Sequence, residues 1–350
     1  MVAIETADRL KSEPVQATRA FGTFPESPQI PTSITETQMR VKGQLISVPS
    51  VQIDGKTVVA TGKCLRMASL HDEDVLEGET VSAPEPFIAQ LKNSGLKVDI
   101  FTFGQKIPDV VPRYNYHLEW DSLAVMPITT YGAWWQRLTK EVRHSVKQAA
   151  RLGVVTREAE FTDTLIEGIV AIYDESSLRQ GRPFWHYKKG FSAVKQLSRT
   201  YLDRSIFIGA YVDNELVGFM KIVKVGIVAH TFHVISMMKH FAKRPTNALI
   251  AKAVEICAEK GIPHLVYGNF IYRDPKSSLA EFKRRNGFRE VLVPRYYVPT
   301  TRKGEVALRL GLHRGAGLIL PSNIWRALAN IRTLMWKLRH LGQRLDFTCL

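Results

Sequence analysis

The feature that most constrains this chain is the stretch of residues 205–299, where short apolar runs alternate with turn residues and helical segments. Three strand-like runs come first (SIFIGAYV, LVGFMKIVKV and VAHTFHVIS), and Asp213-Asn214-Glu215 supplies the turn between the first two. A helix-period run, a short strand, a second helix and a last strand follow, at residues 246–260, 264–270, 277–288 and 290–299. This order predicts an α/β (α+β) domain with a mixed, mostly antiparallel sheet flanked by helices.

Two motifs suggest a family. Residues 282–288 read FKRRNGF, and residues 143–154 read RHSVKQAARLGV. The first resembles the F-K-x-x-x-G-F closure of GNAT acyltransferase domains. The second resembles the R-x-x-[IV]-[KR]-x-A-x-x-x-G-V segment of Fem-like peptidyl- and aminoacyltransferases. The resemblance extends over about residues 60–300, and it implies a GNAT-like fold in two tandem halves with acyltransferase activity.

The resemblance also implies where the acyl donor binds, between the third and fourth strands of the second half. Arg244, Thr246 and Asn247 stand where a donor pyrophosphate would meet the following helix, whose backbone N–H groups can bind an anion. GNAT enzymes carry [QR]-x-x-G-x-[GA] at this junction, whereas this chain has no glycine there. Close approach of a phosphate to the backbone is then harder, which weakens the coenzyme A interpretation.

Further candidates follow the fourth strand. Asn269, Tyr272 and Ser278 stand where GNAT enzymes contact the donor arm. Many of those enzymes place a catalytic tyrosine in the last helix, but Phe282 occupies the corresponding position here, so Tyr272 is the nearest replacement. The alternative is that Tyr272 only packs.

Either histidine of the third strand, His230 or His233, could be a general base, and the alternative is a hydrogen-bonded core histidine. Strict alternation would place His230 on the opposite face, so the two could not share a metal ion. The three cysteines contain no C-x-x-C pair. We therefore expect no metal.

The segment of residues 179–187 interleaves two arginines with three aromatic residues. Such loops often carry function, because a rigid scaffold presents their side chains. We therefore predict substrate contacts from Arg179, Arg182, His186 and Tyr187. The alternative is a packed loop that fills the joint between two halves.

The rest of the chain divides into three parts. Residues 1–45 are polar and proline-rich and predict a disordered leader, and residues 46–160 form an N-terminal GNAT-like half with an Asp54-Gly55 hairpin. Residues 161–300 form the C-terminal acyltransferase domain. Residues 301–350 contain nine Lys/Arg against two acids and predict a basic amphipathic helical tail.

One longer helix in the first half has a buried face and a basic face. The buried face holds Trp135, Leu138, Val142, Val146 and Ala149, and the basic face extends over residues 137–147. The basic face is either a solvated surface or a contact for RNA or phosphate.

The amino-acid composition narrows the classes of binding partner and the cellular location that we expect. A net charge of +15 favours polyanions, although a generally basic surface is the simpler explanation. No apolar run is long enough to span a membrane, and the sparse cysteines suit a reducing compartment. We expect a cytoplasmic protein, with contact between residues 320–345 and an anionic membrane as a variant of this prediction. The tail could equally pack on its own domain.

These observations predict an N-acyltransferase that moves an acyl or aminoacyl group from a thioester or ester to an amine. Acetyl-CoA or another acyl-CoA is the first choice of donor, because that chemistry is common on this fold. A tRNA-dependent aminoacyltransferase of Fem type and a non-catalytic GNAT-like module are the alternatives. The acceptor is a small-molecule or peptide amine, and tRNA is a further candidate partner.

Overall fold

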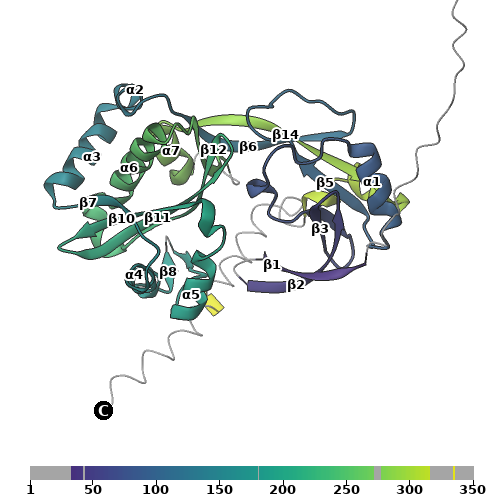
Figure 1. Ribbon diagram of the computed structural model, residues 1–350, viewed down its shortest axis with the longest axis horizontal. Coiled ribbons are helices and arrows are strands. Elements are labelled where there is room, and N and C mark those ends of the chain that lie inside the picture. The colour runs from purple at the N-terminus through teal and green to yellow at the C-terminus, as the bar shows by residue number, and fades with distance from the viewer. Residues whose placement is uncertain (1–32, 42–43, 180, 272–276, 316–333, 336–350) are drawn as a thin grey trace, which may run out of the picture.

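The computed structural model describes residues 33–41, 44–179, 181–271, 277–315 and 334–335. Twelve of the strands in this part form one continuous sheet, in the order β1-β2-β3-β4-β5-β14-β6-β13-β12-β11-β10-β7. Figure 1 shows two lobes, which the long strands β6 (His117–Pro127) and β14 (Arg289–Pro299) connect. The predicted mixed, mostly antiparallel sheet is confirmed.

The first lobe is a five-stranded portion of the sheet covered by one helix. Its elements are β1 (Thr35–Val41), β2 (Gln44–Ile53), β3 (Lys56–Thr61), β4 (Met67–Leu70), α1 (Pro84–Asn93) and β5 (Ile100–Gly104). Phe87 and Leu91 of α1 pack against Phe101 of β5 in its core. The predicted hairpin turn joins β2 to β3, and both of its residues, Asp54 and Gly55, have the positive φ that such a turn requires.

The leader is shorter than predicted. Thr35–Val41 form strand β1, which pairs antiparallel with β2 along its whole length. Thr35 and Thr37 both hydrogen-bond the buried Ser50 hydroxyl on β2. These threonines favour an extended backbone, so the boundary at residue 45 was wrong. Residues 1–32 lie outside the described residues.

The second lobe confirms the predicted elements. They are β10 (Ser205–Val212), β11 (Glu215–Val225), β12 (Val228–Ser236), α6 (Pro245–Glu259), β13 (His264–Asn269) and α7 (Ser278–Arg285). Helix α6 is buried against β10, β11 and β12, with Leu249 and Val254 fully enclosed. Helices α4 (Asp163–Asp174) and α5 (Phe191–Ser198) pack on the other face around Phe207 and Phe219.

The predicted long helix of the first half is two helices, α2 (Tyr131–Arg137) and α3 (Lys140–Arg151). The backbone of Leu138 and Thr139 is extended between them, and Thr139 is the N-cap residue of α3. Trp134, rather than Trp135, is the fully buried tryptophan, and its indole N–H donates to the Asn286 carbonyl.

Helix α3 and the following strand pack with the second lobe. Val142 and Ala149 of α3 share a core with α6, and β7 (Val155–Ala159) pairs with β10. A boundary between the halves at residue 160 remains a prediction, and this packing favours one near residue 128.

Strand β14 belongs to both lobes. It pairs with β6 from Arg289 to Tyr297 and with β5 from Arg295 to Pro299. The chain then forms α8 (Arg302–Arg309) and a 3-10 turn, η4 (Leu312–Arg314). The tail predicted to contact a membrane, residues 320–345, lies almost entirely outside the described residues. No described helix has the length and apolarity that crossing a membrane would take.

Candidate functional site

The site begins where two parallel strands separate. Strand β12 pairs with β13 from Val228, opposite His264, to His230, opposite Val266, and the pairing stops there. Both strands continue beyond that point, to Ser236 and Asn269. The backbone groups facing this gap are therefore not used by a neighbouring strand of the pair, and an extended ligand could occupy it.

Helix α6 begins at the wide end of this gap. Arg244 precedes it in the left-handed conformation (φ 58°), with an exposed side chain, and Pro245 is the first helical residue. The Thr246 hydroxyl lies 2.9 Å from that of Ser236 at the end of β12, and the Asn247 amide donates to Asn286 at 3.1 Å. Thr246 and Asn247 thus tie α6 to its neighbours, whereas the role of the exposed Arg244 as an anion contact remains a prediction.

A buried lysine lies at the end of β13. Lys283 of α7 is fully buried, and its ammonium donates to the Asn269 carbonyl at 2.6 Å and lies 4.6 Å from the centre of the Tyr267 ring. Burial lowers its pKa to about 8. The structure therefore brings the predicted residue Asn269 together with a cation beside the gap.

His230 lies on β12, the strand that faces β13 across the gap. A β-bulge at Phe232 adds a residue to β12, so that His230 lies opposite Val223 and His233 lies opposite Lys221. Val223 and Lys221 are two residues apart and face the same side of the sheet. His230 and His233 therefore share a face, and the alternation argument that separated them was wrong.

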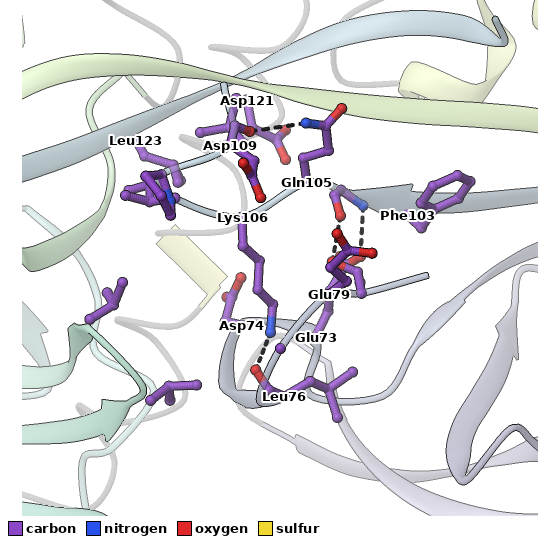
Figure 2. Close-up of a pocket in the computed structure, with 18 of the residues that line it drawn as sticks. Glu73, Asp74, Leu76, Glu79, Phe103, Gln105, Lys106, Asp109, Asp121 and Leu123 are labelled. Carbon is purple, nitrogen blue, oxygen red and sulfur yellow. Dashed lines mark hydrogen bonds between the residues drawn. The ribbon is translucent and has the colours of Figure 1, made fainter. Parts of the chain in front are cut away.

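His230 lines a cavity of about 330 Å³ between the two lobes. The walls come from η1 (Glu73–Val75), the segment after β5, the β11–β12 turn, β6 and β14. Figure 2 shows Asp74, Lys106 and Asp109 around this space, with the Lys106 ammonium donating to the Leu76 carbonyl. Burial lowers the pKa of His230, Lys106 lowers it further and Asp74 opposes them, so the imidazole is neutral at pH 7.

Most of the charges in the cavity wall are paired. Arg295 of β14 binds Glu73 at 2.9 Å and Asp121 at 2.5 Å, and these carboxylates raise its pKa although burial acts in the other direction. Arg113 likewise pairs with Glu79 and Asp109. Asp74 is an exception: in the described part of the chain it makes no hydrogen bond or ion pair. The cavity therefore offers a carboxylate and a neutral imidazole to a cationic ligand.

The arginine–aromatic segment, residues 179–187, contacts the end of β12 through Arg179. Arg179 donates to the carbonyls of Ser236 and Ile172 at 2.7 Å and pairs with Glu175, which accepts the N–H groups of Met238 and Lys239. These bonds hold the chain where it leaves β12 for α6. This placement favours a positioning role for Arg179 over substrate contact.

Its neighbours are divided between surface and interior. Arg182 is exposed on the short strand β9 (Arg182–Pro183), and Tyr187 is half-buried beside Lys188. The His186 ring packs 4.7 Å from Tyr173 and 5.5 Å from His233. His186 and His233 thus meet in an aromatic cluster under α4, and their roles in substrate binding and catalysis remain predictions.

Two predicted donor contacts remain. Ser278 is the exposed first residue of α7, while its neighbour Ser277 caps that helix through the Ala280 N–H. Tyr272 lies outside the described residues. Ser278 therefore brings no new group to the described site.

One group of metal-type ligands lies elsewhere, where β6 meets η4. His313 and Arg314 donate to the Glu119 carboxylate at 2.7 and 2.9 Å, with His117 nearby. The arginine and the histidine account for this carboxylate, and their hydrogen bonds lower its pKa against the effect of burial. We assign no metal to it.

Comparison with solved structures places this geometry in a known fold. FemX superposes with a TM-score of 0.51 at 8% identity, covering 75% of this chain and 88% of FemX. The fold is the Fem-like GNAT fold. L-PGS from Bacillus licheniformis gives 0.48 at 13% identity (73% and 85% covered), and a tandem GNAT protein from the clavulanic acid biosynthesis pathway gives 0.41 at 10% identity (79% and 85%). No protein-family model and no curated protein matches the sequence.

In this Fem-like GNAT fold, one functional candidate was missed from the sequence alone. Lys283 stood inside the FKRRNGF motif but was used there only as a family signature. His230 was set apart from His233 because a bulge cannot be read from an alternating pattern. The predicted resemblance in fold is confirmed.

Proposed function

We propose that this chain transfers an acyl or aminoacyl group from a thioester or ester donor to an amine. The observation that carries the proposal is the juxtaposition at His230. The last paired residue before β12 and β13 separate also lines the cavity between the lobes. A donor lying in the gap and an acceptor lying in the cavity would meet at this histidine.

The residues on the two sides of the gap suit the two halves of the reaction. The acceptor nitrogen attacks the donor carbonyl carbon, a C–N bond forms, and the C–S or C–O bond breaks. The neutral His230 accepts the proton that the amine loses. The Lys283 ammonium, beside the end of β13, stabilises the negative charge on the departing sulfur or oxygen, which takes the proton from His230 and leaves as a thiol or hydroxyl. Positioning supplies much of the rate.

The acceptor proposal depends on the charge of the cavity. A primary amine is cationic at pH 7, so it binds next to a carboxylate before it is deprotonated for attack. Asp74 at the cavity mouth is the carboxylate left for that contact. Apolar side chains of Leu123, Val228 and Val293 line the same space and favour an amine carried on a hydrophobic or extended body. The acceptor is then a small-molecule or peptide amine.

For the donor, we place acyl-CoA ahead of aminoacyl-tRNA. Arg244 at the start of α6 is the candidate contact for a donor pyrophosphate. Against it, Pro245 offers no N–H and no glycine lets a phosphate approach the backbone. Aminoacyl-tRNA would instead use phosphate contacts dispersed over the basic surface.

Titration of the protein with acetyl-CoA and with aminoacyl-tRNA at two salt concentrations tests this choice. Acyl-CoA bound at micromolar concentration with little salt dependence supports the first donor. Affinity for tRNA that falls by about 0.7–0.9 log units per log unit of salt for each neutralised phosphate supports the second. If neither binds, the proposal of catalysis fails and a non-catalytic GNAT-like module replaces it. Location in the cytoplasm and membrane contact through residues 320–345 remain predictions.

A further inference from the structure

A second cavity, far along the sheet in the first lobe, has the opposite electrostatic character. It encloses about 620 Å³ between the end of α1, the segment before β4 and the start of α8. Five cationic residues line it, together with a single acid, Asp99: they are Lys63, Arg66, Lys92, Lys97 and Lys303. We call these five residues with Asp99 the basic basin.

The acid does not neutralise the basin. Asp99 is largely buried and already accepts the Arg66 backbone N–H at 2.9 Å, the Thr301 hydroxyl at 3.0 Å and the Lys303 ammonium at 3.2 Å. These bonds outweigh burial, which alone would raise the pKa of Asp99, and its pKa is lowered. The Asp99 carboxylate is thus already paired with Lys303 and with the Thr301 hydroxyl at the start of α8.

The other four cations have no such partner. The side chains of Lys63, Arg66, Lys92 and Lys97 are exposed, and none of them forms an ion pair within the described ranges. Like charges gathered around one concavity repel one another, and an anion that lies among them removes this cost. The basin therefore has the geometry and the charge of an anion-binding site.

We propose that the basic basin binds a compact phosphorylated group, either a free phosphate ester or the headgroup of a phosphorylated lipid. The concave shape and the volume suit a ligand of the size of a diphosphate or phosphosugar. No aromatic side chain lines the basin, so it lacks the stacking platform that single-stranded nucleic acids use. This site is independent of the transfer reaction proposed above, because none of its residues lines the cavity at His230.

The test compares two double variants of the full chain by isothermal titration with inorganic pyrophosphate. Lys63→Gln with Lys97→Gln removes two basin charges. Arg199→Gln with Lys224→Gln removes two exposed cations elsewhere and serves as the matched control. Each charge-assisted contact is strong enough that the basin variant should lose about tenfold or more in affinity, while the control keeps it. All four residues are exposed, and unchanged melting temperatures would establish that both variants fold.

Vesicles then distinguish the sources of the phosphate. Binding to phosphatidylcholine vesicles containing phosphatidic acid, lost in the basin variant only, assigns the site to a lipid headgroup. Pyrophosphate binding without vesicle binding assigns it to a soluble ester. The proposal is overturned if pyrophosphate does not bind, if the control variant loses as much affinity as the basin variant, or if the basin variant weakens only binding of tRNA.

Discussion

Replacement of Lys283 by methionine tests whether this buried lysine serves the transfer reaction or only the stability of the fold. Lys283 is fully buried, and its ammonium donates to the Asn269 carbonyl at 2.6 Å. Burial lowers its pKa from the usual 10.5 to about 8, which costs roughly 3 kcal/mol of folding free energy at neutral pH. Methionine removes that cost but leaves the Asn269 carbonyl without its donor, which costs about 1–3 kcal/mol. Because these opposing effects are of similar size, the free energy of unfolding of Lys283→Met at pH 7 should stay within about 2 kcal/mol of that of the wild type.

The pH dependence of the folding stability provides a second test of the same lysine. Between pH 8 and 10.5 the unfolded chain holds a proton on this lysine that the folded chain has lost, so the stability of the wild type rises with pH through that window. Below pH 8 both states are protonated and the contribution is constant. Lys283→Met should lose the rise, worth roughly 3 kcal/mol.

Urea unfolding at pH 7, 8.5 and 10 measures both effects, and Lys221→Met is the matched control. Lys221 is also buried, with its pKa lowered to about 8, and it donates to the Ser198 carbonyl at 2.9 Å, away from the β12–β13 gap. Both variants should lose part of the alkaline rise, but only Lys283→Met should lose transfer, by about 10²–10³-fold. A Lys283→Met protein that is strongly destabilised at pH 7, or that keeps wild-type transfer, would refute the reasoning.

Four further outcomes are expected. His230→Gln should lower the rate of transfer about 10²–10⁴-fold and abolish the acid limb of the pH–rate profile. The midpoint of that limb lies below 6.5, because burial lowers the pKa of His230 against the opposing charge of Asp74. An unchanged pH–rate profile would exclude His230 as the base. Asp74→Asn should raise KM for the amine while kcat changes little, and an effect on kcat alone contradicts its role in binding. Arg244→Ala should weaken acyl-CoA binding by about 1.5–3 kcal/mol, as calorimetry can measure, and unchanged affinity in a folded variant excludes the contact. Arg295→Met should destabilise the fold by about 3–5 kcal/mol in urea, because Glu73 and Asp121 lose their shared cation, and a loss under 1 kcal/mol would contradict a buried pairing.

Local patterns were sufficient for most elements of the second lobe. Asp213 and Asn214 both take positive φ in the turn between β10 and β11, as short hairpins require. Helix α6 ends at Glu259, just before Gly261, whose φ is 62°. Such features depend on residues a few positions apart, so the sequence carries them directly.

The candidate site depends on contacts that no local pattern contains. Strand β14 pairs with β5 and β6, which are far from it in sequence, and this pairing places Arg295 between Glu73 and Asp121. The bulge at Phe232 decides which face His230 and His233 share, because one extra residue inverts an alternation of period two. The sequence by itself thus determined most elements of the second lobe, their turns and the class of fold. Only the tertiary structure decided which side chains meet, because strand pairing and burial join residues that are far apart in the chain.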